Sequence, residues 1–443
     1  MKKINITIIG AGSAQFSAGI IRDLCISDDL EGAHVTLMDI DEKRLDMVEL
    51  FAKKIVKELG RDVTFTKTLD REKALEGADF VLNTVQVGGH SYPLDMIAIA
   101  EKHGYYRDYT LVDASQLIFH LGLAQDVERI CPDAWLIQSG NPVFEGCTLI
   151  HRLTKAKILG LCHGHYGYLE LARKIGLDPE HVTAQMSGFN HWIFMTDFRY
   201  KGENAYPLLD KWIEEKGPDY WANFKPSFSD VQLSYAACEQ YRLFGLMPIG
   251  DTPRILGWWY NDSLESKKRG FGHIGGFDSY EGWDIYLEGL NKNLKKIEEA
   301  ATDDSRKATD IFPPVKTHEQ IVPIMESLVF DKERVYQVNI PNKGGIVKGF
   351  PEDLVIECPG VVNGSGIKGI VQPELPRRIF AGAMIPFWQK AESIITAVAD
   401  HDKNMLFLHL LGNHNTRSFA QAEACFDEIW NHPRNDFMRE WFR

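Results

Sequence analysis

One cysteine and three histidines stand out first, because their types and spacing suit metal binding. Cys162, His163 and His165 follow directly after the apolar run 158–161, and His191 interrupts a later apolar pattern. A thiolate and an imidazole can hold a divalent ion while leaving positions open for substrate oxygens. Cys162 and His191 are therefore candidate metal ligands, with a buried small cysteine and a core histidine as the alternative interpretation.

A second pattern, at the N-terminus, suits a dinucleotide. Gly10, Gly12 and Ser13 belong to the tetrapeptide GAGS, which follows a β-branched run and precedes a helical pattern. The glycines allow a tight turn, and a helix N-terminus offers free N–H groups to a pyrophosphate. Asp39, at the end of the next strand, can accept hydrogen bonds from ribose hydroxyls and disfavours a 2′-phosphate, so NAD is favoured over NADP. A turn without ligand, with Asp39 as a helix N-cap, is the alternative, and Gln15 replaces the usual third glycine.

Strands that alternate with helices must position these residues. Short apolar runs of strand type alternate with amphipathic stretches of helical period, which predicts βαβ units and a Rossmann-like, doubly wound parallel sheet of the α/β class. The predicted strands are 4–9, 34–38, 80–84, 135–138 and 158–161, and the clearest predicted helices are 16–26 and 41–59. Ligands of such sheets bind beyond the carboxyl ends of the strands, where both candidate sites lie.

The pattern changes near residue 182. Residues 182–200 are typical of two strands broken around Asn190, and aromatic-rich helical stretches follow. A glycine-rich segment at 339–372 and a helical C-terminus complete the chain. We expect a Rossmann-like NAD-binding domain at 1–181 and an α+β substrate- and metal-binding catalytic domain at 182–443, packed closely together.

Composition limits the class of partner and the compartment. The 443 residues are 44% hydrophobic and 25% charged, with a net charge of −13, which argues against nucleic acid or an anionic membrane as the main partner. Seven cysteines without a C-x-x-C pair indicate reduced thiols. The N-terminus imitates a signal peptide, but Asn5 and Thr7 interrupt its apolar stretch, and no apolar run is long enough to span a membrane. A cytoplasmic location is therefore predicted.

Several longer motifs give the chain a resemblance to the NAD- and metal-dependent family 4 glycoside hydrolases over nearly its whole length. The motifs are IIGAGS at 8–13, LMDID at 37–41, NTVQVGG at 83–89, SGNP at 139–142, CHGH at 162–165, FNH at 189–191 and IPNKGGIVKGFP at 340–351. The resemblance implies a fold like that of lactate and malate dehydrogenases, and it implies NAD, contacted also by Asn83 and Val87. It further implies a divalent ion, typically Mn²⁺, on Cys162 and His191. Ligand softness alone would favour zinc.

The resemblance also implies the chemistry. These enzymes are exceptions to the two-carboxylate rule of glycosidases. The sugar is oxidised at C3 by NAD⁺, a base removes the C2 proton, the aglycone leaves C1, water adds, and C3 is reduced again. Asp251 is the first candidate for the base, with Tyr260 and Tyr241 behind it, and a turn residue is the alternative role of Asp251. His163 and His165 are candidates for protonating the leaving oxygen.

The residues after the metal cysteine indicate the sugar. CHGH resembles members that act on α-linked uronic acids, α-galacturonides foremost, and the resemblance implies that Asn141 and Asn190 hold sugar hydroxyls. A carboxylate needs a cationic partner, for which Arg254 is the candidate, with His165 as a second donor. The alternative role of Arg254 is a structural salt bridge, and the stretch HGYYRDY at 103–109 departs from the family pattern.

Other functions stay open at this point. An α-glucuronidase, a neutral α-galactosidase or an α-glucosidase of the same family are close alternatives. From other classes, a 2-hydroxy acid dehydrogenase would release NADH in proportion to turnover, and a non-catalytic NAD sensor would need no metal. The family resemblance also implies a homodimer or homotetramer.

Overall fold

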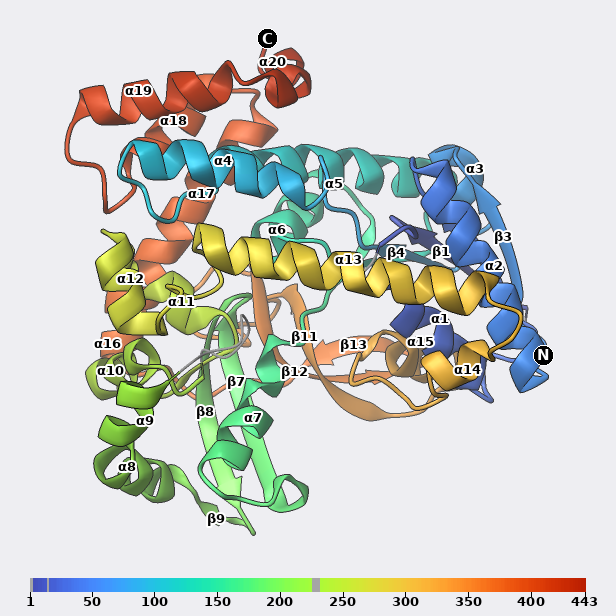
Figure 1. Cartoon of the computed structure of the whole chain (residues 1–443), viewed down its shortest axis with the longest axis horizontal. Coiled ribbons are helices and arrows are strands. Elements are labelled where there is room, and N and C mark those ends of the chain that lie inside the picture. The colour runs from blue at the N-terminus through green and yellow to red at the C-terminus, as the bar shows by residue number, and fades with distance from the viewer. Residues whose placement is uncertain (1–2, 14–15, 225–231) are drawn as a thin grey trace.

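One 13-stranded sheet runs through the molecule, with helices on both faces (Figure 1). The computed structural model describes residues 3–13, 16–224 and 232–443. The strands are β1 (Asn5–Ile9), β2 (His34–Met38), β3 (Thr64–Thr68), β4 (Phe80–Asn83), β5 (Trp135–Gln138), β6 (Lys157–Gly160), β7 (Val182–Phe189), β8 (Trp192–Tyr200), β9 (Glu203–Asn204), β10 (Pro248–Ile249), β11 (Arg334–Pro341), β12 (Val355–Asn363) and β13 (Gly366–Gly369).

The first six strands form a parallel sheet in the order β3-β2-β1-β4-β5-β6. This order is that of the Rossmann fold, so the predicted fold class is confirmed. Its apolar strand residues are buried because helices cover both faces. The helices of this half are α1 (Ser17–Ile26), α2 (Glu42–Leu59), α3 (Arg71–Leu75), α4 (Ser91–Lys102), α5 (Thr110–Ile130), α6 (Val143–Leu153) and α7 (Gly167–Lys174).

The sheet then continues with antiparallel strands. β11 joins β6 through the pair Asn339 and Gly160, and β12, β7, β8 and β10 follow outward from β11. A side chain at Gly160 would place its Cβ 2.8 Å from the Cβ of Asn339, so the close approach of the two strands requires glycine there. Much of the glycine-rich segment 339–372 lies in β11, β12 and β13, strands that the sequence did not predict. One continuous sheet contains strands from before and from after residue 181. The division into two domains at that residue therefore stays a prediction.

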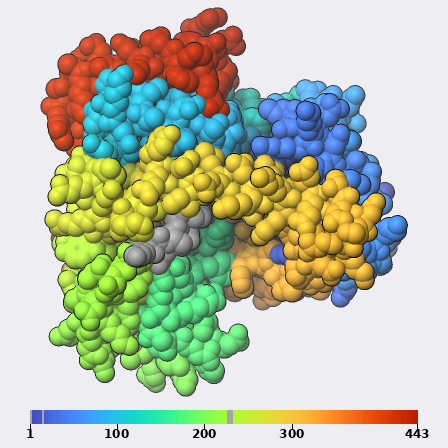
Figure 2. Space-filling view, viewed as in Figure 1, coloured from blue at the N-terminus to red at the C-terminus, as the bar shows by residue number. Residues whose placement is uncertain are grey.

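The remaining helices tie the second half to the first. The long helix α13 forms a band across one face and packs on α2 and α4 (Figures 1 and 2). The C-terminal helices α17 to α19 pack on α4, α5 and α6. These later helices are α8 (Tyr206–Glu215), α9 (Gly217–Asn223), α10 (Tyr235–Phe244), α11 (Thr252–Leu256), α12 (Leu264–Phe271), α13 (Tyr280–Thr302), α14 (Ala308–Ile311), α15 (Ile321–Phe330), α16 (Arg377–Ile379), α17 (Ile385–Ala399), α18 (Lys403–Leu411), α19 (Phe419–Trp430) and α20 (Asp436–Trp441).

Two further observations bear on the predictions from composition. All seven cysteines are free, and six of them are buried; Cys162 is the more accessible one. Across the three described ranges, none of the helices combines the length and the apolarity needed to cross a bilayer.

Candidate active site

One cavity of about 690 Å³ collects half of the predicted site residues. It lies beyond the carboxyl ends of β4, β5 and β6, and α11, α17 and the segment before α13 complete its walls. The predicted residues that line it are Ser13, Asn141, Cys162, His163, Asn190, His191, Asp251 and Arg254. The parallel sheet brings these residues together because the loops that follow its strands meet at one edge.

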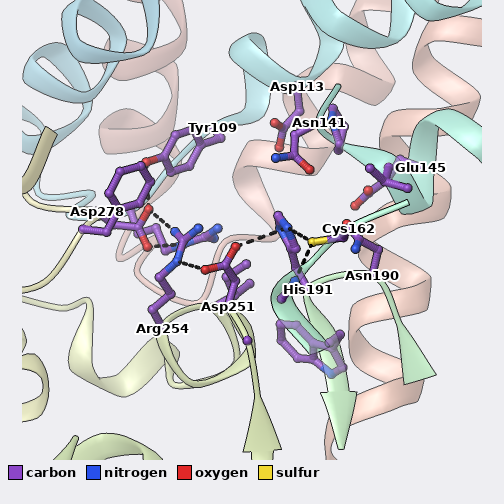
Figure 3. A pocket seen from close by; sticks show the side chains of 18 of the residues that line it. Tyr109, Asp113, Asn141, Glu145, Cys162, Asn190, His191, Asp251, Arg254 and Asp278 are labelled. Atoms are coloured by element: carbon purple, nitrogen blue, oxygen red, sulfur yellow. Dashed lines mark hydrogen bonds and ion pairs between the residues drawn. The ribbon is translucent and has the colours of Figure 1, made fainter. Parts of the chain in front are cut away.

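The two candidate metal ligands face each other on this wall. Cys162 Sγ lies 3.6 Å from His191 Nε2, and His191 occupies the turn between β7 and β8 with a φ of 61° (Figure 3). Bond lengths near 2.3 Å to sulfur and 2.1 Å to nitrogen place two ligands of one ion about 3 to 3.6 Å apart. The spacing therefore fits a shared divalent ion, and the left-handed backbone of His191 is a strained conformation of the kind found at functional sites.

Other ligands of such an ion would come from the substrate or from water. Within the described part of the chain, no three His, Cys, Asp or Glu side chains form a group that could hold a metal together. Burial raises the pKa of the Cys162 thiol to about 12, and the nearby carboxylates raise it as well. A divalent cation has the opposite effect and deprotonates a coordinating thiol. The donor set thus suits an ion that keeps open positions for sugar oxygens.

The glycine turn has the geometry of a dinucleotide cradle. Gly10 has a φ of 86°, and a Cβ there would lie 2.9 Å from a side-chain carbon of Val85. Gly12 N donates to Asp39 Oδ2 at 2.7 Å, and Asp41 N donates to Asp39 Oδ1 at 2.9 Å. Asp39 does not cap α2, because Asp41 is the N-cap and accepts from a backbone N–H in the first turn. Gln15 lies outside the described residues.

The other predicted cofactor residues, Asn83 and Val87, do not line the cavity, and neither do Gly10, Gly12 and Asp39; Ser13 is the residue of the turn that does. Asn83 is fully buried, donates to Gln138 Oε1 and accepts from Val85 N. Val87 N donates to Gln116 Oε1 at 2.8 Å. Both residues therefore fix the loop after β4, whose residues Thr84, Val85 and Gln86 do line the cavity.

Asp251 and Arg254 lie on the side of His191 that is away from Cys162 (Figure 3). Asp251 Oδ2 lies 3.2 Å from His191 Nε2, and its Oδ1 accepts from Arg254 Nε at 2.9 Å (Figure 3). Burial alone would raise the pKa of Asp251, but Arg254 and then His191 outweigh it and hold the pKa well below its ordinary value. Arg254 also donates to Asp278 Oδ1 at 2.6 Å, and its side chain is only 11% exposed. Two carboxylates thus already engage the arginine that the sequence suggested for a substrate carboxylate.

The predicted acids and second-choice bases separate into two groups. His163 is exposed at the cavity, and its hydrogen bond to Glu319, at 3.1 Å, raises its pKa. His165, Tyr260 and Tyr241 do not line the cavity. The ring of His165 is buried against Cys162 O, and Tyr260 and Tyr241 donate to Glu239 and Asp210. The structure therefore does not bring these three side chains to the site.

The sequence patterns did not indicate several charged or phenolic residues of the cavity. Among them are Arg107, Tyr109, Asp113, Glu145, Asp278 and Lys390. Asp278 accepts from Tyr109 Oη at 2.8 Å and from Arg107 Nε at 3.2 Å. Burial raises the pKa of Glu145 to about 7 and that of Asp113 well above its ordinary value. The departure of HGYYRDY from the family pattern was a signal for Arg107 and Tyr109, whereas Asp113 and Glu145 sit in helices whose sequence does not mark them.

The fold and the glycine turn place this chain among the α/β proteins of the Rossmann type, with a cavity at the carboxyl edge of its parallel strands. The chain belongs to the family 4 glycosyl hydrolases. The family model matches residues 5–177, and the model of the family's C-terminal domain matches residues 186–416. This membership favours a glycosidase over the dehydrogenase and the NAD sensor.

The names of individual relatives indicate different sugars. The chain is 28% identical to an alpha-glucosidase of Erwinia rhapontici over 411 residues, which cover 84% of this chain and 85% of that protein. It is 23% identical to an alpha-galacturonidase of Thermoanaerobacter italicus over 463 residues, which cover 99% and 98%. A solved 6-phospho-alpha-glucosidase from gut microorganisms, in complex with NAD and Mn²⁺, has 18% identity and a TM-score of 0.82, with 97% and 98% covered.

Proposed function

We propose that this protein is an NAD- and divalent-metal-dependent α-galacturonidase. One observation carries the proposal: Cys162 and His191 face each other in the same cavity that Ser13 and the loop after β4 line. A metal pair and a dinucleotide turn that share one cavity suit chemistry in which a sugar is oxidised and deprotonated at neighbouring carbons.

The residues present fit both cofactors. Gly10 and Gly12 would hold the NAD pyrophosphate, and Cys162 and His191 would hold the ion, with Mn²⁺ as the first choice. When bound, NAD supplies reversible hydride transfer at the sugar, and the ion polarises sugar oxygens. The complex of the gut 6-phospho-alpha-glucosidase with NAD and Mn²⁺ supports this assignment.

The protein's own side chains would then move the protons. Asp251 is the proposed base for the C2 proton: Arg254 holds its pKa low, which keeps the carboxylate ionised but also makes it a weaker base. Arg254 fixes the orientation of that carboxylate. Glu319 raises the pKa of His163, which favours the protonated imidazole and suits donation to the leaving oxygen.

Two asparagines would position the sugar hydroxyls. Asn141 is exposed to the cavity, and Asn190 is fixed by a hydrogen bond from its Nδ2 to Glu357 Oε2 at 3.0 Å. Side chains held by neighbours lose little entropy when they bind a hydroxyl. We assign no catalytic role to His165, Tyr260 or Tyr241.

The uronide specificity is supported by the CHGH motif and by the extent of similarity. The alpha-galacturonidase of T. italicus aligns with 99% of this chain, whereas the alpha-glucosidase of E. rhapontici aligns with 84%. We also propose a cytoplasmic homodimer or homotetramer, from the reduced cysteines and the family resemblance; size-exclusion chromatography with light scattering tests the oligomer.

The test is cleavage of p-nitrophenyl α-galacturonide with NAD⁺, Mn²⁺ and a thiol reductant. We expect turnover without net NADH and product that carries deuterium at C2 when the reaction runs in D₂O. The matching glucuronide, galactoside and glucoside should have lower kcat/KM. Faster cleavage of a neutral glycoside would contradict the uronide assignment while leaving the glycosidase class intact.

Substitution of the metal cysteine sharpens the test. Cys162→Ser should lower turnover by more than about 100-fold, the upper range for loss of an outer-shell partner, because it removes a ligand outright. NAD affinity, measured by fluorescence titration, should stay unchanged. Cys131→Ser, at a cysteine outside the cavity, is the matched control. Full activity of Cys162→Ser in chelator-treated, metal-free buffer would overturn the metal assignment.

A further inference from the structure

Three cationic side chains line the cavity among the described residues: Arg107, Arg254 and Lys390. The three cations differ in the number of carboxylates with which each is already paired. Arg254 binds both Asp251 and Asp278, and Arg107 binds Asp278 through Nε alone. For Lys390 Nζ, no hydrogen bond or ion pair is found within residues 3–13, 16–224 and 232–443. Lys390 is therefore the cavity cation with the most unused binding capacity.

The position of Lys390 is fixed, although its ammonium is not paired. It lies half-buried on α17, and its carbonyl oxygen is the partner of His409 Nδ1 and Ser393 Oγ. Burial lowers the pKa of Lys390, and Asp108 is the strongest of the nearby groups that raise it. A half-buried ammonium without a partner is costly unless an anion enters its surroundings.

The nearby acids do not supply that anion. Asp108 is already held by the backbone N–H of Thr110 and by Asn413 Nδ2, at 3.0 and 2.9 Å. Asp113 and Glu145 line the same cavity, but burial favours their neutral forms. None of the three comes within ion-pairing distance of Lys390 Nζ.

Arg107 lies close enough to Lys390 for its positive charge to lower the pKa of the lysine. Its Nε is used by Asp278, and its ring-facing guanidinium stacks on Tyr109 with 5.2 Å to the ring centroid. The two terminal nitrogens of Arg107 make no hydrogen bond to another described residue. A monoanion between Arg107 and Lys390 would relieve their repulsion and satisfy both donors.

We propose that Lys390 and Arg107 bind the C6 carboxylate of the galacturonide and thereby set the specificity for uronides. Arg254 is then a positioning residue for Asp251 and not the carboxylate receptor. The inference rests on the proposed function. It favours a carboxylate over a phosphate, because the carboxylate of Asp108 near Lys390 would repel a dianion more strongly than a monoanion.

The test compares an anionic and a neutral substrate that differ only at C6. Removing one partner of a buried charge pair costs about 2–5 kcal/mol, so Lys390→Met should lower kcat/KM for p-nitrophenyl α-galacturonide by about 100-fold. For p-nitrophenyl α-galactoside or the galacturonide methyl ester, the change should stay under about 3-fold. Lys390→Arg should recover most of the uronide activity, because it restores the charge.

Lys296→Met, at an exposed lysine of α13 outside the cavity, is the matched control and should leave both substrates unchanged. Equal losses on the anionic and neutral substrates would show a structural role for Lys390 and overturn the inference. Lys390→Gln replaces the methionine variant if circular dichroism shows that the latter is unfolded.

Binding of free galacturonate to the NAD- and Mn²⁺-loaded enzyme separates this inference from the proposed function. Calorimetric titration should give a Kd at least about 10-fold weaker for Lys390→Met than for the wild type, and galactose should show no such difference. Equal galacturonate affinities would overturn the role of Lys390 even in an enzyme that cleaves uronides. A wild type that binds galacturonate through Lys390 but cleaves no galacturonide would instead overturn the proposed function.

Discussion

Two groups of charged residues lie on either side of the Cys162–His191 pair, and they differ in how their charges are balanced (Figure 3). On one side, Asp251, Arg254 and Asp278 form a continuous chain of ion pairs with distances of 2.6 and 2.9 Å. On the other side, Asp113 and Glu145 form no ion pair with any described residue and have raised pKa values. We call these groups the paired cluster and the unpaired cluster, and Lys390 belongs to the latter.

This difference in charge pairing indicates which side of the cavity is a scaffold and which side is available to a ligand. A charge that is already neutralised has little to gain from a substrate, whereas an unpaired buried charge gains most. We therefore expect the paired cluster to fix the geometry of Asp251 and the unpaired cluster to discriminate among sugars. The following experiments would break or sharpen this contrast.

The largest effect should come from breaking the paired cluster. Asp278, with a side chain only 3% exposed, is the shared acceptor of Arg254, Arg107 and Tyr109. Asp278→Ala would leave Arg107 without its carboxylate partner and Arg254 with Asp251 alone, so the free energy of unfolding should fall by about 3–5 kcal/mol. Urea denaturation measures this, with Asp284→Ala, at an exposed acid of α13, as the control. A loss under about 1 kcal/mol would show that the cluster is not a scaffold.

A smaller effect of opposite sign is expected in the unpaired cluster. Burial raises the pKa of Glu145 from an ordinary value near 4.5 to about 7, so ionisation of this group opposes folding. The wild type should lose stability as the pH rises from 4.5 to 7, and the loss should persist above pH 7. Glu145→Gln cannot ionise and should be more stable than the wild type by about 3 kcal/mol at pH 8.

At pH 4 the two proteins should differ little, because Glu145 is then protonated in both the folded and the unfolded state. Urea titrations at pH 4 and pH 8 give the comparison. A Glu145→Gln variant that is less stable than the wild type at pH 8 would mean that the carboxylate is paired after all.

The smallest effect concerns a residue that belongs to neither cluster. Tyr260 is buried, donates to Glu239 and does not line the cavity. Tyr260→Phe should therefore change kcat/KM by less than about 3-fold, since the lost hydrogen bond contributes about 1 kcal/mol to stability and touches no substrate. Asp251→Asn, which removes the candidate base, should lower kcat/KM by more than about 100-fold in the same assay. A large loss in Tyr260→Phe would restore the tyrosine as a candidate base.

The local elements of the first half could be predicted closely. The predicted strands 34–38 and 135–138 coincide with β2 and β5, and the two strands around Asn190 are β7 and β8. These runs are apolar or alternate clearly, which a sequence window can detect. β3 was missed because its residues, TFTKT, are mostly polar and exposed at the edge of the sheet.

The strands of the glycine-rich segment could not be predicted in the same way. β11 and β12 form strands by pairing with each other. β11 also pairs with β6, which lies far earlier in the chain. Strand propensity depends strongly on such neighbours, so their sequence alone carries a weak signal.

The sequence alone was enough to predict the glycine turn, the candidate metal ligands Cys162 and His191 and the family, because each prediction depends on residue types at short spacing or on extended motifs. Only the tertiary structure decided how the charges are shared. Arg107 and Asp278 are 171 residues apart, yet they make a 3.2 Å contact, and this pairing engages Arg254 as well. The strength of an ion pair depends on the distance and burial that the fold imposes on its partners, and no local pattern encodes either quantity. For that reason the arginine that the sequence suggested for the substrate is already neutralised, and Lys390 on α17 is the cavity cation whose ammonium makes no ion pair or hydrogen bond with another described residue.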